Sequence, residues 1–165
     1  MTGTSHDSFT IERHYDASRA SVFDAWAKPE LRERWFAGGE GWTVLIREQD
    51  FRTGGHERVR GQWQDGRTSD FRSTYHDIVD GERIVFVYDM YVSDEKISVS
   101  VATVELYDDG GGTRMRYTEQ GAYLEYADDG SREQGSNFLV DRLGAFLEGR
   151  PLPTPVGCGV RSEDA

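Results

Sequence analysis

The chain has 165 residues, 36% of them apolar and 12% aromatic, which suits a single domain with one packed core. It carries 30 acidic and 19 basic residues, and the resulting net charge of −11 repels polyanions. No apolar run approaches the roughly 18 residues that a transmembrane helix needs, and the first residues do not resemble a secretion signal. We therefore expect no nucleic-acid partner and no membrane insertion.

A strand and two short helices are the first elements predicted along the chain. Residues 9–15 alternate apolar and polar side chains, a pattern typical of a strand. Asp16 and Ser18 are N-cap candidates for a first helix. Pro29 suits the first turn of a second helix, which the glycine-rich run at 37–41 ends.

Six more strands and a long helix follow. Short β-branched and aromatic runs are separated by turn dipeptides such as Gly54-Gly55, and connections this short allow only antiparallel pairing. The predicted strands cover residues 42–51, 56–64, 69–79, 83–93, 96–107 and 113–122. After Ser131, an apolar stripe through Leu139, Leu143 and Leu147 has helical spacing, and this stripe must pack against the sheet.

The order of elements predicts an α+β fold in which a seven-stranded, curved antiparallel sheet wraps around a long C-terminal helix. Two short helices lie between the first and second strands. We expect one domain over residues 9–149, flanked by flexible segments at 1–8 and 150–165. A curved sheet rarely closes tightly onto one helix, so a cavity is expected between them.

Four segments carry a resemblance to a known family. They are VFDAWAKPELRERWF, FRTGGHERVRGQW, DIVDGERIVFVYDMYV and TVELYDDGGGTRMRYTEQG. Over roughly residues 9–149 the chain resembles the activator-of-heat-shock-protein-90-ATPase-homologue domain of the START/Bet v-like superfamily, the polyketide cyclase/dehydrase and lipid-transport group. The resemblance implies the helix-grip fold and a cavity that holds hydrophobic ligands, with cyclisation or hydrolysis in some branches.

The sequence shows no motif for a phosphate loop, a metal site or a cofactor. The pair Gly54-Gly55 leads into an extended run rather than a helix, so it predicts a turn between strands. No two histidines have the His-x-x-x-His spacing of a zinc site; they are His6, His14, His56 and His76. We expect neither a metal nor a cofactor.

Nucleophilic catalysis also lacks a recognisable motif. Ser73 and Ser100 lie in strand-like runs without a nucleophile elbow. The one cysteine, Cys158, is near the end of the chain and cannot form an internal disulfide. This cysteine usage predicts a reducing, cytoplasmic setting.

The candidate ligand-binding residues are mainly aromatic side chains on the predicted inner face of the sheet. Buried Tyr and Trp need a polar partner, so several of them around one space indicate a mostly apolar small-molecule site. The candidates are Trp35, Trp63, Phe71, Tyr75, Phe86, Tyr88, Met90, Val101, Tyr117, Glu119 and Phe138. Glu119 and Arg58 are the charged candidates; an inward Glu119 is a potential general acid, and a solvated or arginine-paired Glu119 is the alternative.

Three functions stay open at this point. The first is binding of a small hydrophobic or aromatic molecule between the C-terminal helix and the sheet. The second is a cyclase or hydrolase using Glu119 or His76 as acid or base. The third is a chaperone-interacting module acting through its outer surface, and the amphipathic strands also allow a homodimer.

Overall fold

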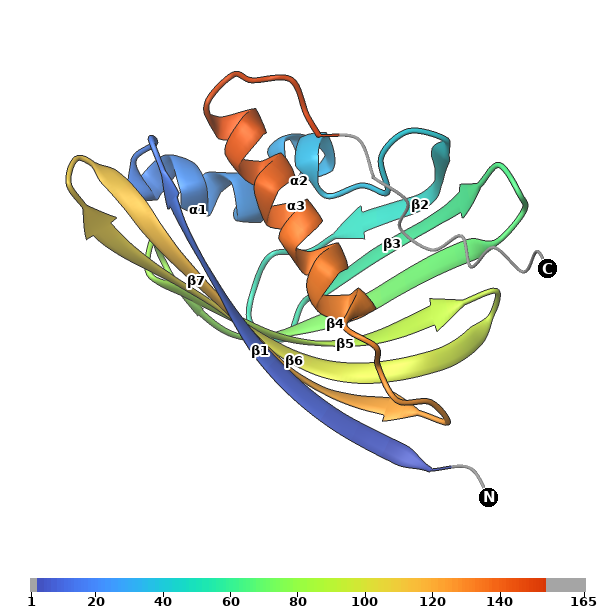
Figure 1. Ribbon diagram of the computed structural model, residues 1–165. Coiled ribbons are helices and arrows are strands. Elements are labelled where there is room, and N and C mark those ends of the chain that lie inside the picture. The colour runs from blue at the N-terminus through green and yellow to red at the C-terminus, as the bar shows by residue number, and fades with distance from the viewer. Residues whose placement is uncertain (1–2, 154–165) are drawn as a thin grey trace.

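A curved, seven-stranded antiparallel sheet wraps around one long helix in the computed structural model, which describes residues 3–153 (Figure 1). The strands lie in the order β1-β7-β6-β5-β4-β3-β2. Their bounds are Thr4–Tyr15 (β1), Trp42–Gln49 (β2), His56–Trp63 (β3), Thr68–Val79 (β4), Arg83–Val92 (β5), Glu95–Asp109 (β6) and Gly112–Leu124 (β7). The predicted α+β helix-grip fold is confirmed.

Three helices are described within residues 3–153. The two short ones, α1 (Arg19–Ala27) and α2 (Pro29–Trp35), connect β1 to β2, and α3 (Ser131–Leu147) crosses the concave face of the sheet (Figure 1). The Ser18 side chain accepts a hydrogen bond from the Ser21 amide and so caps α1. None of these helices is long and apolar enough to cross a membrane.

The N-terminal strand starts earlier than the alternation pattern indicated. It begins at Thr4 rather than Phe9, because residues 4–8 pair in antiparallel register with residues 120–124 of β7. Residues 4–8, expected to be a flexible segment ahead of the domain, therefore lie in β1. At the other end, residues 154–165 of the predicted tail, Cys158 included, lie outside the described residues.

The glycine pair at 54–55 forms the predicted turn between β2 and β3. Gly54 has a φ of 83°, in the left-handed region that glycine adopts without strain. A Cβ at Gly55 would lie 2.1 Å from the carbonyl oxygen of Asp50, so only glycine fits there. The turn is also tied to β4, because Gly54 N donates to Tyr75 O and Tyr75 N donates to Gly55 O.

A buried ion pair joins α2 to the sheet. Arg32 Nε and Nη2 donate to the two carboxylate oxygens of Glu57 at 3.0 and 2.8 Å, and both side chains are 2% exposed. Burial alone lowers the pKa of Arg32, but the neighbouring Glu57 carboxylate outweighs it and leaves that pKa above its ordinary value. The guanidinium also lies 3.7 Å from the ring centre of Phe36, so the pair holds the aromatic end of the core together.

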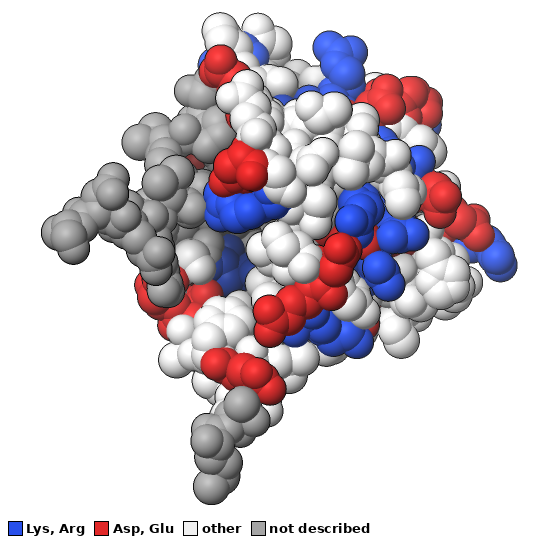
Figure 2. Space-filling model, turned by 90° about the vertical axis from the view of Figure 1, so that its right-hand side faces the viewer, with Lys and Arg blue, Asp and Glu red and all other residues white. Residues whose placement is uncertain are grey.

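A second buried carboxylate lies on the convex face. Asp70, 1% exposed, accepts hydrogen bonds from Arg58, Arg60 and Arg72. Burial raises the pKa of Asp70, but the hydrogen bonds from Arg58 and Arg72 outweigh this and lower it to about 2. On the side of the molecule that is at the right in Figure 1, acidic and basic side chains are interspersed (Figure 2).

Removing one partner of the buried pair tests its role in the fold. Glu57→Gln leaves the Arg32 charge without its carboxylate, and we expect the free energy of unfolding to fall by about 3–5 kcal/mol. Urea unfolding followed by circular dichroism measures this. Asp50→Asn, which breaks the exposed Arg52–Asp50 pair, is the matched control and should change stability by less than about 1 kcal/mol. Equal effects of the two substitutions would contradict this account.

The Asp70 cluster gives a pH-dependent prediction. A carboxyl group with a folded pKa of about 2 and an unfolded pKa of about 3.9 stabilises the fold above pH 4, and this contribution is lost as the pH falls. Near neutral pH, Asp70→Asn should be less stable than the wild type by about 1–2 kcal/mol, allowing for solvent around the arginines. The difference should close between about pH 4 and about pH 2. A gap that stays constant over this range would show that the Asp70 charge does not stabilise the fold.

Candidate functional site

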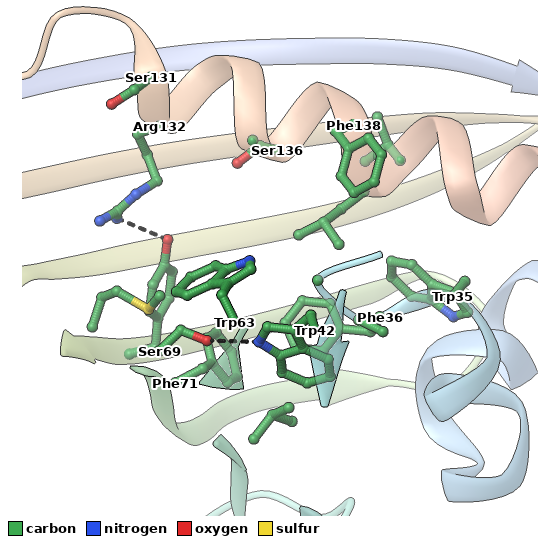
Figure 3. A pocket seen from close by; sticks show the side chains of 18 of the residues that line it. Trp35, Phe36, Trp42, Trp63, Ser69, Phe71, Ser131, Arg132, Ser136 and Phe138 are labelled. Atoms are coloured by element: carbon green, nitrogen blue, oxygen red, sulfur yellow. Dashed lines mark hydrogen bonds between the residues drawn. The ribbon is translucent and has the colours of Figure 1, made fainter. Parts of the chain in front are cut away.

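A pocket of about 790 Å³ lies between α3 and the concave face of the sheet and is partly open to solvent (Figure 3). Residues from α1, α2, the loop after α2, strands β2 to β5 and β7, the turn between β3 and β4, and α3 as far as Val140 line it. Its walls are mainly aromatic. The ten aromatic lining residues are Trp26, Trp35, Phe36, Trp42, Trp63, Phe71, Phe86, Tyr88, Tyr117 and Phe138.

Strand alternation and the two short helices bring these rings together. On β4 and β5, Phe71 and Tyr88 point to the concave face, with ring centres 4.8 Å apart. From the helices, Trp26 and Trp35 meet edge to face at 4.8 Å, and Trp26 stacks on Tyr117 of β7 at 6.4 Å. These contacts fix the rings in place, so the apolar walls of the pocket are largely pre-formed.

The Trp42 ring packs against two glycines and hydrogen-bonds to one serine. A Cβ at Gly61 would lie 1.9 Å from the Trp42 ring, and one at Gly38 would lie 2.4 Å from it. The indole nitrogen of Trp42 donates to Ser69 Oγ at 3.1 Å (Figure 3). Trp42 is not among the residues predicted to line the pocket, although a glycine within a strand can indicate that another group approaches the backbone closely.

A buried polar region of the pocket lies around Arg132, in the first turn of α3. The Arg132 side chain reaches down to the sheet, where Nη1 donates to Tyr88 Oη at 2.9 Å (Figure 3). Nη1 also lies 3.3 Å from Glu119 Oε2, and the hydroxyls of Tyr88 and Tyr117 donate to Glu119 Oε1 at 2.8 and 2.7 Å. Glu119 is 1% exposed, so it faces inward and pairs with an arginine.

Two serines on β6 complete this polar region. Arg132 Nη2 donates to Ser98 Oγ at 2.6 Å, and Nη1 donates to Ser100 Oγ at 3.2 Å. Both serines are buried on the concave face. The opposite face of β6 therefore carries Val101, which is 36% exposed. The prediction that Val101 lines the cavity is wrong, because β6 turns its small polar residues inward to meet Arg132.

Burial determines the protonation of the tyrosines and the arginine in this region. It raises the pKa of Tyr88 and of Tyr117, and the nearby Glu119 carboxylate raises both further. Burial alone lowers the pKa of Arg132, but Tyr88 and Glu119 outweigh it, so that pKa is raised. Near neutral pH both tyrosines therefore stay protonated and donate hydrogen bonds to Glu119, while Arg132 stays charged.

The structure brings most of the predicted ligand-binding residues to one pocket. Those that line it are Trp35, Trp63, Phe71, Phe86, Tyr88, Met90, Tyr117 and Phe138. Glu119 lies behind Tyr88 and Tyr117 rather than in the lining. Tyr75 is buried in the core, where its hydroxyl accepts a hydrogen bond from Gln49.

Two other charged or titratable candidates face away from the pocket. Arg58 lies on the convex face and pairs with Asp70, so the expectation that it faces the cavity is wrong. His76 is exposed and is not among the lining residues, which removes it as an acid or base for this pocket. Within residues 3–153, no group of three His, Cys, Asp or Glu side chains is placed to hold a metal ion.

Arg132 is the main functional candidate that sequence reasoning missed. It precedes Leu139 by seven residues and Ser136 by four, so it lies on the helix face that looks toward the sheet. An arginine in the first turn of α3, on the same face as the apolar stripe, was the available signal. Its partners could not be identified, because Ser98, Ser100 and Glu119 lie on two strands whose position relative to α3 is set by the tertiary fold.

Comparisons with known proteins agree with the fold. The sequence model of a family described as "Activator of Hsp90 ATPase homolog 1-like protein" matches residues 16–148. A solved structure of a putative uncharacterized protein from Rhizobium leguminosarum has 40% identity and a TM-score of 0.86, covering 91% of this chain and 99% of that one. The Mll3558 protein from Rhizobium loti has 39% identity and a TM-score of 0.79, covering 88% and 99%.

A more distant structure shows the shared fold alone. The AHSA1-like protein from Aeromonas hydrophila has 23% identity and a TM-score of 0.69, covering 87% of this chain and 93% of that one. No curated protein matches the chain.

The close packing of the Trp42 ring against Gly61 can be tested by substitution. Gly61→Ala places a methyl group inside the Trp42 ring volume, so the ring must move and the free energy of unfolding should fall by about 1–3 kcal/mol. In a Trp42→Ala background the same substitution should have almost no further effect, because the clash is gone. Urea unfolding of the four variants of this double-mutant cycle measures the coupling. Additive effects would contradict the contact.

Proposed function

The chain belongs to the Activator of Hsp90 ATPase homolog 1-like family, and we propose that it binds a small hydrophobic or aromatic molecule in the pocket between α3 and the sheet. The fold of this family supports a ligand-binding domain in general. The choice of this pocket and of this class of ligand is based on the chemistry of the pocket walls.

One observation carries the proposal: ten aromatic side chains surround about 790 Å³ of space and meet a buried polar region around Arg132. Pockets for small molecules usually have this composition, with apolar walls that supply affinity and a few polar groups that fix orientation. The volume lies within the range of roughly 300–1,000 Å³ that is typical of such sites. The aromatic contacts described above fix the pocket walls, which reduces the ordering cost of binding.

An acid–base enzyme of the cyclase or hydrolase type is a second candidate, because a buried carboxylate beside a pocket is common in active sites. The contacts of Glu119 favour a binding role instead. Both carboxylate oxygens face donors of the protein, and Tyr88 and Tyr117 separate the carboxylate from the pocket. Turnover that disappears in Glu119→Gln, with ligand affinity retained, would favour the enzyme.

The family description also names activation of a chaperone ATPase. A protein that activates a chaperone would contact it through the outer surface of the domain. Filling the pocket therefore separates this role from ligand binding, because a filled pocket abolishes binding of a small molecule and leaves the outer surface intact.

Gly135 offers a way to fill the pocket without disturbing the fold. It lies in α3, lines the pocket, and has nothing within 4 Å of the position that a Cβ would take. Gly135→Phe should weaken binding of the neutral fluorescent probe N-phenyl-naphthylamine by about tenfold or more, because the ring occupies the ligand's space. A fluorescence titration measures this.

Gly135→Ala is the matched control. Alanine should raise the free energy of unfolding by about 0.5–1 kcal/mol, since it favours the helix more than glycine does, and should keep most of the probe affinity. Unchanged probe affinity in a folded Gly135→Phe variant would contradict binding in this pocket.

A further inference from the structure

The polar region of the pocket would be an anion site if Arg132 stood alone. Its guanidinium lies in the pocket wall, and arginine suits carboxylate and phosphate groups. Arg132 is not alone, however. Glu119 Oε2 lies 3.3 Å from Nη1, and this carboxylate is 1% exposed, so the two opposite charges balance inside the protein.

The remaining contacts hold the carboxylate in place beneath the pocket. The hydroxyls of Tyr88 and Tyr117 both donate to Glu119 Oε1, so Glu119 cannot turn away without losing two buried hydrogen bonds. The other charged lining residues are Glu40, Asp65 and Arg67, and a 2.7 Å contact pairs Asp65 with Arg67. Neither the buried region nor the remaining lining therefore provides a net positive charge for an anionic ligand.

A ligand carboxylate would lose its hydration on entering and find a guanidinium that is already neutralised. A neutral hydroxyl would meet more suitable partners. Arg132 is surrounded by hydroxyl groups, from Tyr88, Ser98 and Ser100, at 2.6–3.2 Å. A further hydroxyl can both donate and accept, so it can join this network without adding a charge.

We propose that Glu119 is a specificity-determining residue: by neutralising Arg132 it makes the pocket select a neutral aromatic molecule with a hydroxyl group over the corresponding carboxylate. The inference rests on the proposed function, because it requires that a ligand bind in this pocket. It also gives Glu119 a role without catalysis, since the carboxylate acts on the ligand through Arg132.

Three naphthalene derivatives that differ only in their polar group test the wild-type protein. They are naphthylmethanol, which is neutral, naphthoate, which is an anion, and naphthylmethylammonium, which is a cation. Isothermal titration calorimetry near neutral pH should show the alcohol binding about tenfold or more tightly than either ion. Tighter binding of naphthoate than of the alcohol would overturn the inference and leave the proposed function intact. Failure of all three to bind would overturn both.

Glu119→Gln distinguishes a specific effect of Glu119 on ligand preference from the general cost of burying any ion. The substitution leaves Arg132 with an uncompensated charge, so the ratio of naphthoate affinity to alcohol affinity should rise by about tenfold or more. Glu105→Gln removes the same charge from β6, where Glu105 faces Arg116 outside the pocket, and should leave the ratio unchanged. An equal ratio in Glu119→Gln and the wild type would overturn the inference. If Glu119→Gln does not fold, the order of the three affinities in the wild type still tests the inference.

Discussion

The pocket exists because the side chains of the first half of α3 do not fill the space between the helix and the sheet. The second half of this helix is fastened to the rest of the core through buried side chains such as Val140 and Leu143. The first half carries Gly135 and Ser136 on the same inward face, and these are too small to fill the concavity of the sheet. Arg132 bridges the remaining gap with a long polar side chain, so the helix is held at both ends and open space is left beneath it.

The opposite wall depends on the buried pair of Arg32 and Glu57. The Arg32 guanidinium lies within 4.8 Å of the ring centres of Trp26, Trp35 and Phe36, all of which line the pocket. Glu57 fixes that guanidinium to β3. A buried ion pair is weak evidence for stability as such, but here its geometry orients three aromatic walls at once. Two arginines, each matched by one buried carboxylate, thus define the two ends of the pocket.

The sequence was sufficient to predict the architecture and much of the aromatic lining. Turn dipeptides and periodicity gave the seven strands and the helix, and alternation placed residues such as Phe71 and Tyr88 on the inner face correctly. Alternation assigned Val101 to the wrong face of β6. The inward face of this strand is polar, because Ser98 and Ser100 hydrogen-bond to Arg132 there. Such pairings cross between distant segments, so local patterns could not reveal them.

All four tryptophans of the chain line the pocket, which provides a direct test of the account. In an NMR titration with naphthylmethanol, we expect saturable shifts of the indole N–H signals, largest for Trp63 and Trp42, the two that are only half-buried. The Trp35 indole, which is 1% exposed and donates to the carbonyl oxygen of Ala25, should shift least. Saturable shifts confined to backbone amides on the convex face, with the indole signals unmoved, would contradict binding in the pocket.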